Sequence, residues 1–546
     1  MKTTIYSAQK VITMNPNQPE VSHVAVRDGR ILGAGTLEDL AGWGPYELDD
    51  RFADKVLMPG LIEGHAHSME GALWNFTYVG WFDRMDPDGK VWDGLKTVDE
   101  AVARLKEAAS AMEDPDRPLL GWGFDPIYMA NVRMTRADLD RVSDTRPIGV
   151  LHASGHILNV NTKGLDLAGL LKPGNTHPGI PLGEDGFPTG ELKSPEIMMP
   201  AGQHVGMDRA FLSADPEALQ NYARLCVRSG VTTSSDLGQQ LDDDLVEMFS
   251  EVTGAGDYPV CLVPFRINMG LSPKELVEYT ASLRERSTER LELGRIKVIA
   301  DGSIQGFSAR MRWPGYYNGA ENGLWYIAPD QLAEIYERAL EAGVQVHTHT
   351  NGDEATQLAI ETMETSLRKH PDFDHRFTLQ HCQLASAAQF RKMARLGMCV
   401  NLFANHHFYW GDEHYALTVG PERAQSMNAC HTALAEGVPM TIHSDAPVTP
   451  LGPIFTAWAA VNRRTASGRV QGENERITVL QALHAVTLGA AITMKMDHQI
   501  GSIEIGKRAD FAVLESDPTT VAPEALKDIP VWGTVQGGRI FEAASI

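Results

Sequence analysis

The sequence predicts an α/β protein built on a (β/α)8 TIM-type barrel, with a small composite β-sandwich domain and an inserted α/β segment after the first barrel strand. Apolar runs that end in polar residues recur through the middle of the chain. Amphipathic stretches separate most of them, as in a barrel of alternating strands and helices. The two chain ends are instead rich in short β-type runs and turns. The interval at about 70–225 is too long for one crossover connection, so we expect it to hold the inserted segment.

Eight stretches have the pattern of barrel strands. They lie at residues 58–67, 231–236, 261–266, 296–301, 344–349, 377–381, 398–401 and 440–445. Amphipathic stretches such as 329–342 and 384–396 have the period of helices that cover a barrel. We therefore assign residues 58–494 to the barrel domain, which includes the inserted segment.

The chain ends are predicted to form one β domain. Asp28-Gly29 stands between two β-type runs, which is the signal of a two-residue hairpin turn. Chain termini of a domain often lie close together. We therefore predict that residues 1–57 and 495–546 combine into one composite β domain.

Composition and charge limit the classes of function. The chain has 546 residues, 43% hydrophobic and 22% charged, which is an ordinary globular composition too long for a single core. Lys and Arg number 48 and Asp and Glu 71, so the net charge of −23 argues against nucleic acid or an anionic membrane as partner. The five cysteines are scattered, as is typical of a reducing compartment. We find no signal peptide and no membrane-spanning run, and therefore expect a cytoplasmic protein.

Polar side chains close five of the predicted barrel strands, at the face where barrel enzymes build their active sites. They are His65, His67, Lys297, Asp301, His347, His349, His381, His443 and Asp445. Paired members lie two or four residues apart, hence on one face of their strand. Burying so many ionisable groups without partners is costly, and a divalent metal would offset that cost. Taken alone, His65 and His67 favour a polar turn, so the prediction rests on the five strands together.

This set of side chains fits a one- or two-metal hydrolytic centre, in which metal-bound water becomes hydroxide near neutral pH. Asp445 would lie at the metal, take up the proton of the attacking water and pass it to the leaving nitrogen. Lys297 cannot ligate a cation as an ammonium group, which leaves two interpretations. Either it forms an ion pair with Asp301, or it reacts with CO2 to give a carbamate that serves as a bridging carboxylate.

Six segments, in this order, carry a resemblance to a known family. They are Pro-Gly-Leu-Ile-Glu-Gly-His-Ala-His at 59–67, Lys-Val-Ile-Ala-Asp-Gly-Ser at 297–303, His-Thr-Asn-Gly-Asp at 349–353, Gln-His-Cys-Gln at 380–383, His-Ser-Asp-Ala-Pro at 443–447 and the tail 501–514. Together they resemble the amidohydrolase superfamily and, within it, the amidohydrolase-3 group, which includes the N-substituted formamide deformylases. The resemblance implies one or two divalent metals, zinc being the expected ion, and a carboxylated Lys297 that bridges two of them. The other ligands it implies are His65, His67, His349, His381 and Asp445.

Two residues depart from the pattern of the resembled family. Gln380 stands where many relatives have Glu, and His347 is an additional imidazole on the fifth strand. Either difference could alter the groups that hold the ligands, or weaken one metal position.

Candidates for substrate binding come from the resemblance and from the aromatic segment 403–410. The resemblance implies that His156 and Asn159, on the inserted segment, lie near the substrate. Segment 403–410 follows the seventh strand, and forms either an aromatic wall for an apolar or aryl substrate or a cluster that packs the loop onto the barrel. With Trp122 as a further aromatic residue, and Asp301 and His347 from the strand ends, the candidates are His156, Asn159, Trp122, Asp301, His347, Phe403, His406 and His407.

The sequence therefore predicts a hydrolase acting on carbon–nitrogen bonds other than peptide bonds. Its substrate would be a small N-substituted amide, formamide or aryl amide, and the protein a homodimer. Alternatives on the same barrel are a cyclic amidohydrolase, a deaminase and a metal-dependent decarboxylase. A carboxylated Lys297 favours hydrolysis of amides or cyclic amides by two metals, whereas an unmodified lysine with one metal favours deaminase or lyase chemistry. An enzyme-dead scaffold would have lost metal ligands, and none of the implied ligands is missing.

Overall fold

The computed structural model describes residues 3–129, 132–155, 157–193, 195–207 and 215–546. The chain divides into two compact units. The larger unit combines Met1–His67 with Cys226–Ile546, and the smaller unit is Ser68–Leu225. Each unit has its own sheet and core, and the candidate metal centre belongs to the larger one.

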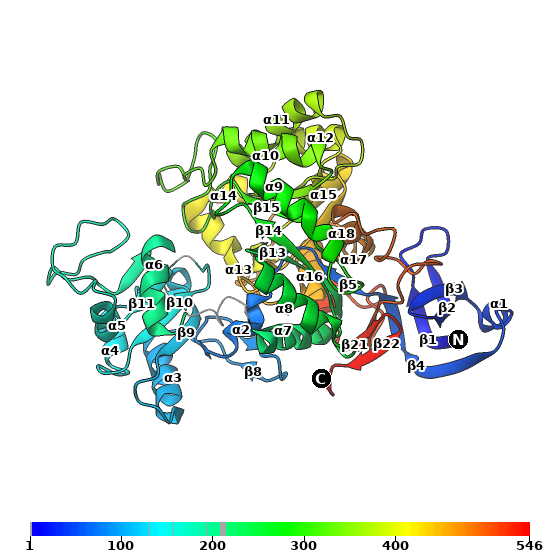
Figure 1. The fold of residues 1–546 in the computed structure, drawn as a ribbon, viewed down its shortest axis with the longest axis horizontal. Coiled ribbons are helices and arrows are strands. Elements are labelled where there is room, and N and C mark those ends of the chain that lie inside the picture. The colour runs from blue at the N-terminus through cyan, green and yellow to red at the C-terminus, as the bar shows by residue number, and fades with distance from the viewer. Residues whose placement is uncertain (1–2, 130–131, 156, 194, 208–214) are drawn as a thin grey trace. The chain divides into compact units, whose positions relative to one another are not determined.

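Eight parallel strands form the sheet at the centre of the larger unit (Figure 1). In sheet order they are β19 (Met440–Ile442), β18 (Cys399–Leu402), β17 (Thr378–His381), β16 (Gln345–Thr350), β15 (Arg295–Ile299), β14 (Cys261–Ile267), β13 (Val231–Gln239) and β5 (Leu61–Glu63). Just beyond the two edge strands, a parallel bridge joins Ala66 to Ala446. The sheet therefore curls back on itself, as in the predicted TIM-type barrel.

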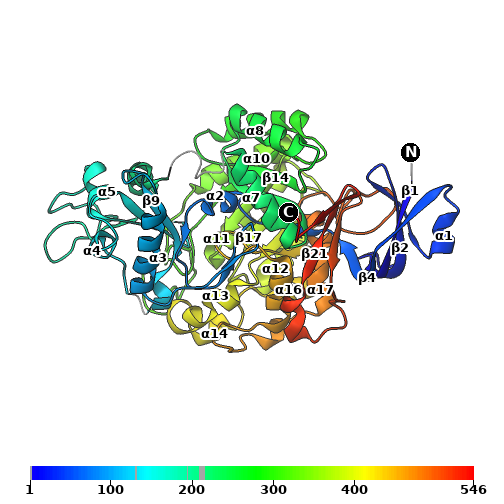
Figure 2. The same ribbon diagram turned by 90° about the horizontal axis from the view of Figure 1, so that it is seen from below.

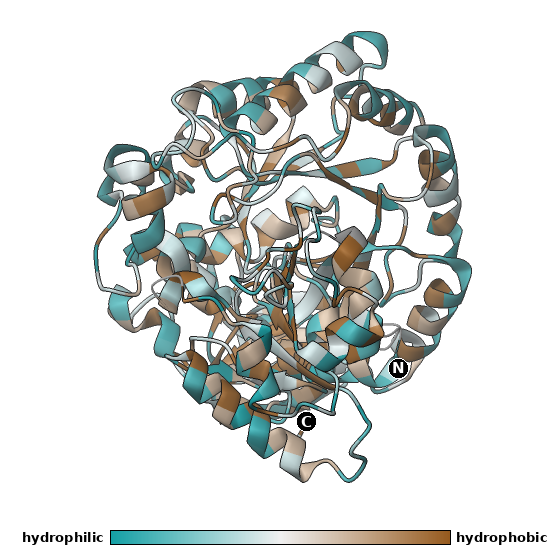
Figure 3. Ribbon diagram, turned by 90° about the vertical axis from the view of Figure 1, so that its left-hand side faces the viewer, coloured by the Kyte–Doolittle hydropathy of each residue, from teal (hydrophilic) through white to brown (hydrophobic). Residues whose placement is uncertain are grey.

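Helices follow the barrel strands and surround the sheet (Figure 1). They are α8 (Asp243–Gly254), α9 (Pro273–Ser282), α10 (Pro329–Glu341), α11 (Asp353–Lys369), α12 (Ala387–Leu396), α13 (His406–Glu413), α14 (Gly420–Ala424), α15 (Cys430–Ala435), α16 (Pro453–Asn462), α17 (Val479–Ala485) and α18 (Leu488–Thr493). Hydrophilic and hydrophobic residues alternate along the helices at the outside of the protein, as expected of helices with one buried face (Figure 3). Within the described ranges, no helix is both long enough and apolar enough to cross a membrane.

Both chain ends contribute to a single seven-stranded sheet, in which red C-terminal strands lie next to the blue N-terminal ones (Figure 2). Its order is β22 (Arg539–Glu542), β21 (Val531–Gln536), β20 (Phe511–Leu514), β4 (Tyr46–Pro59), β1 (Thr3–Ile12), β2 (Glu20–Arg27) and β3 (Arg30–Gly35). The strands form one hydrogen-bonded sheet, because β20 pairs directly with β4. Residues from both halves of this sheet, among them Val24 and Val535, share one apolar core, and the sandwich stays a prediction. The predicted turn at Asp28 and Gly29 joins β2 to β3, with φ of 52° and 73°.

The terminal sheet passes into the barrel at Gly60. The N–H group of Gly60 donates to the carbonyl oxygen of Asp510 at 2.9 Å. A Cβ atom at this position would lie 1.9 Å from Oγ1 of Thr232, so no side chain fits. This close approach separates the end of β4 at Pro59 from the start of β5 at Leu61, four residues before His65.

The smaller unit has an α/β core of its own. Its main sheet has the order β12 (Glu191–Lys193), β11 (Ile157–Val160), β10 (Ile148–His152), β9 (Leu119–Phe124) and β6 (Thr77–Tyr78). Its longer helices are α3 (Val98–Ala111), α6 (Pro195–Gly202) and α7 (Pro216–Arg228), the last of which crosses the boundary between the units. Trp122 and Leu158 are among the buried residues of its apolar core.

Candidate metal centre

Imidazole and carboxylate groups converge at the carboxyl ends of the first, sixth and eighth barrel strands. In the described part of the chain two groups could hold a cation: His65 with His381 and His443, and His65 with His67 and Asp445. In each group the candidate ligand atoms lie within 4.8 Å of one another. Because His65 belongs to both groups, the five side chains form one continuous cluster.

Backbone hydrogen bonds tie the segment after β19 to the segment after β5. The N–H group of Asp445 donates to the carbonyl oxygen of His65 at 3.0 Å, and that of His67 donates to Ala446 at 2.7 Å. The side chains of these residues also lie close together. Oδ1 of Asp445 is 3.4 Å from Nε2 of His65 and 3.3 Å from Nε2 of His67. The closed barrel therefore brings three of the predicted ligands together.

His443 and His381 form the other half of the cluster. The amide of Asn401 donates to the carbonyl oxygen of Gly64 at 3.0 Å, which turns its Oδ1 to Nδ1 of His443 at 2.7 Å. His443 therefore carries its proton on Nδ1 and faces Nδ1 of His381, 3.1 Å away, with its Nε2 lone pair. The remaining nitrogen of His381, Nε2, is buried without a hydrogen-bond partner among the described residues. Because an unpartnered buried nitrogen is costly, the residues here fit a bound cation.

Burial keeps three imidazoles of the cluster neutral, those of His65, His381 and His443, as metal ligands must be. It lowers the pKa of His443 to about 3, partly opposed by the charge of Asp445. It also holds the pKa values of His65 and His381 well below their usual range.

Lys297 on β15 is buried beside the cluster, with 2% of its surface exposed. Its Nζ lies 3.4 Å from Nε2 of His65. Burial lowers the pKa of Lys297 to about 7, against the attraction of Asp445. The first of the two interpretations of Lys297, an ion pair with Asp301, is not supported, because the carboxylate of Asp301 is bound by backbone N–H groups.

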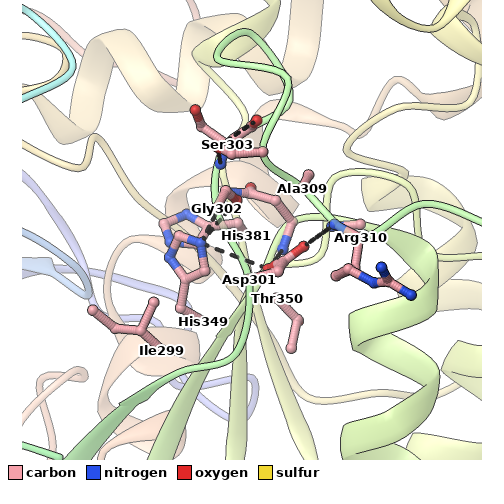
Figure 4. A network of polar contacts seen from close by, with 12 residues as sticks. Ile299, Asp301, Gly302, Ser303, Ala309, Arg310, His349, Thr350 and His381 are labelled. Carbon is pink, nitrogen blue, oxygen red and sulfur yellow. Dashed lines mark hydrogen bonds and ion pairs between the residues drawn. The ribbon is translucent and has the colours of Figure 1, made fainter. Parts of the chain in front are cut away.

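Asp301 holds together the loops that follow β15 and β16 (Figure 4). Its Oδ1 accepts from the N–H group of Asn351, and its Oδ2 from those of Arg310 and Gly352, each at 2.9 Å. Burial raises the pKa of Asp301 to about 7, although these bonds favour the charged form. Asp301 therefore shapes these loops, and its part in substrate binding stays a prediction.

His349 on β16 lies between this network and the cluster (Figure 4). Its ring centroid is 4.5 Å from that of His381. Its Nε2 lies 3.2 Å from the carbonyl oxygen of Gly302 and 3.7 Å from Oδ1 of Asp301. His349 is therefore in neither of the two groups above, and its role as a ligand stays a prediction.

His347 does not face an open site, because both of its nitrogens are engaged in the protein interior. Nδ1 lies 2.8 Å from Nε2 of Gln380, and Nε2 lies 3.1 Å from the carbonyl oxygen of Thr493. Gln380 in turn reaches Nδ1 of His65 with its Oε1 at 2.8 Å. The two departures noted in the sequence are thus hydrogen-bonded to each other and to a predicted ligand.

The aromatic segment after β18 is divided between the cluster and the core. The ring of Phe403 stacks on His443 with centroids 4.8 Å apart, so it borders the cluster. His406 is buried against Trp410, and its Nδ1 lies 2.9 Å from Nε2 of His414. His407 is a core residue rather than the predicted substrate contact, because its Nε2 lies 2.8 Å from the carbonyl oxygen of Met427.

Three further substrate candidates belong to the smaller unit. The ring of Trp122 is buried next to Tyr78, with centroids 4.9 Å apart. Asn159 is buried and donates to the carbonyl oxygen of Met134 at 2.7 Å. His156 lies outside the described residues. Their part in substrate binding stays a prediction.

Two members of the site were not among the ligands predicted from the sequence. His443 stands two residues before Asp445 and is among the polar residues at the strand ends, but the resemblance does not imply it as a ligand. Glu63, two residues before His65, accepts hydrogen bonds from both segments of the cluster. A single carboxylate on a buried strand carries no comparable signal in the sequence.

Comparison with known proteins identifies the family to which the chain belongs. The profile of a family described as "Amidohydrolase family" matches residues 53–541. The chain belongs to the amidohydrolase family. The match spans the barrel, the end of β4 and the C-terminal strands of the terminal sheet, so it confirms the resemblance carried by the six segments.

Relatives of this amidohydrolase have different names. Protein LONG AFTER FAR-RED 3 of Arabidopsis thaliana is 27% identical over 97% of this chain and 90% of that protein. The N-substituted formamide deformylase of Arthrobacter pascens is 24% identical over 94% of this chain and 94% of that enzyme. A crystal structure of an uncharacterized metal-dependent hydrolase from Pyrococcus horikoshii has a TM-score of 0.74 at 20% identity, covering 96% of this chain and 99% of that one. This last likeness supports the fold.

Proposed function

We propose that this amidohydrolase uses a divalent metal to hydrolyse the C–N bond of a small N-substituted amide, such as a formamide or an aryl amide. The observation that carries the proposal is the cluster of imidazoles, closed on one side by the carboxylate of Asp445. The similarity to an N-substituted formamide deformylase supports the substrate class.

The residues that would hold the metal are His65, His67 and Asp445, with His381 and His443 for a second position. Imidazole and carboxylate donors suit zinc. When bound, the cation polarises the amide carbonyl and lowers the pKa of a water molecule.

The solvent exposure of the side chains indicates from which side a substrate can reach the cluster. The side chains of His65 and His381 are 2% exposed, whereas those of His67 and Asp445 are 27% and 12% exposed. A substrate therefore reaches the cluster past His67 and Asp445. From this position Oδ1 of Asp445 can take the proton of the attacking water and release it to the departing nitrogen.

Hydrolysis of formanilides, acyl-anilides and cyclic imides by the zinc-loaded chain tests the proposal. Asp445→Asn should lower kcat by about 1000-fold or more, because an amide cannot take up the proton. The control is His431→Gln, which changes an exposed histidine and should leave activity intact. Full activity of Asp445→Asn, or no hydrolysis of any of these substrates, would refute the proposal.

A further inference from the structure

We infer that Gln380 and His347 form a hydrogen-bonded relay that decides which nitrogen of His65 faces the metal centre. The inference rests on the proposed function, because it concerns how a ligand of that centre is held. The relay runs from Thr493 through His347 and Gln380 to His65. The side chains of His347, Gln380 and His65 are buried, with at most 2% of each residue exposed.

The backbone carbonyl group of Thr493 decides which nitrogen of His347 carries the proton, and therefore which way the hydrogen bonds of the relay run. This carbonyl oxygen lies 3.1 Å from Nε2 of His347, and a carbonyl can only accept, so this nitrogen carries the proton. Thr493 is the last residue of α18, where carbonyl groups have no partner within the helix. Burial keeps His347 neutral, so its other nitrogen, Nδ1, has a lone pair.

Gln380 transmits this choice to His65. Only the NH2 end of the Gln380 amide can donate to Nδ1 of His347, at 2.8 Å. The carbonyl end is thereby turned to Nδ1 of His65, also at 2.8 Å, which must donate to it. His65 then presents its Nε2 lone pair to the centre, 3.4 Å from both Lys297 and Asp445.

An ionised glutamate could not replace Gln380 in this relay. A carboxylate accepts at both ends, so His347 would need a proton on Nδ1 as well as on Nε2. His347 would then be either charged in a buried position or turned with a lone pair toward the carbonyl oxygen of Thr493, and both are unfavourable. Gln380 and His347 are therefore positioning residues, which act on the metal through His65.

Binding of Co²⁺ to the metal-free chain tests the relay. Competition with a chromophoric chelator gives the affinity, and the visible absorption of bound Co²⁺ reports its coordination. We expect Gln380→Leu, His347→Leu and Gln380→Glu each to weaken binding by about 10-fold or more, and to change the absorption. Because the two residues act in series, the double variant of Gln380→Leu and His347→Leu should bind no more weakly than Gln380→Leu alone.

Gln345→Met provides a matched control. Gln345 is also buried and donates to the same carbonyl oxygen of Thr493, at 2.8 Å, but it does not belong to the chain of bonds that reaches His65. Its Co²⁺ affinity and absorption should match those of the unmodified chain, even where its melting temperature falls. If the leucine variants do not fold, the nearly isosteric Gln380→Glu carries the same comparison.

Two results would overturn the relay alone: unchanged Co²⁺ affinity in all the relay variants, or losses that simply add in the double variant. An unmodified chain that binds neither Co²⁺ nor Zn²⁺ would instead refute the proposed function, and the relay with it.

Discussion

Glu63 and Ser444 lie 381 positions apart in the chain and share a 2.7 Å hydrogen bond from Oγ of Ser444 to Oε2 of Glu63. The other carboxyl oxygen of Glu63 accepts from the N–H groups of Ser444 and His65, both at 3.2 Å. Burial raises the pKa of Glu63 to about 8. One buried carboxyl group therefore joins the segments that carry His65 and Asp445.

Replacing Glu63 should loosen the junction between these two segments. Glu63→Leu leaves one hydroxyl and two N–H groups without an acceptor, which should lower the free energy of unfolding by about 3 kcal/mol or more. Glu63→Gln keeps a carbonyl acceptor and should lose less than half of that. Urea unfolding of the metal-free chain measures the difference. Equal stability of the two variants would show that the carboxyl group does not hold the junction.

Lys297 should react with CO2. A pKa of about 7 leaves much of the amine neutral at neutral pH. The neutral amine attacks CO2, forming an N–C bond and releasing a proton. After incubation with ¹³C-bicarbonate, the chain should show a carbamate ¹³C signal that is absent from Lys297→Met. Protonation of the amine should diminish the signal below about pH 7. A signal that survives Lys297→Met would place the carbamate elsewhere.

The barrel could be predicted because some of its strands contain apolar runs that are buried on both faces. All residues of β14 (Cys261–Ile267) are buried, and the run 261–266 shows this in the sequence. Helix ends depend on single caps: α12 begins at Ala387 rather than 384, because Ser386 accepts from the N–H group of Gln389. The sequence predicted that both chain ends form one β domain, but not the pairing of β20 with β4, which joins distant segments.

Only those site residues could be predicted whose positions follow from the pattern of the barrel strands. His65, His67 and Asp445 converge because each follows a barrel strand, and the sequence shows those positions. The sequence does not show which distant backbone carbonyl oxygen forms a hydrogen bond with a given side chain. His347 is bound by Thr493, 146 positions away, and His407 by Met427, so neither could be recognised as an interior residue.

His152 should make the stability of the smaller unit depend on pH. Burial lowers its pKa from the usual 6.5 to about 4, while a hydrogen bond to Asn159 opposes the shift. The unfolded chain therefore takes up a proton at a higher pH than the folded unit. The stability contribution is complete above pH 6.5 and is lost as the pH falls to about 4, by about 3 kcal/mol.

Hydrogen exchange of the amides in β9 and β10 follows this unfolding locally. In His152→Phe the part of the pH dependence between about 4 and 6.5 should disappear. An unchanged pH dependence in that variant would assign it to other groups.

We expect Asp301 to hold the loops that follow β15 and β16 through the placement of its two acceptor oxygens, rather than through its negative charge. Asp301→Ala removes the acceptor of three buried N–H groups, which should cost about 3 kcal/mol or more in the free energy of unfolding. Asp301→Asn retains one oxygen, which can serve the Arg310 and Gly352 N–H groups together. Its NH2 group then faces the N–H group of Asn351, so only that bond should be lost, at about 1–2 kcal/mol.

Hydrogen exchange at these three amides distinguishes the two variants, with the exposed Asp330→Asn as control. In Asp301→Asn we expect faster exchange at Asn351 and near-normal protection at Arg310 and Gly352, whereas Asp301→Ala should expose all three. Equal loss of protection in both variants would mean that the negative charge, rather than the placement of its two oxygens, holds these loops beside His349.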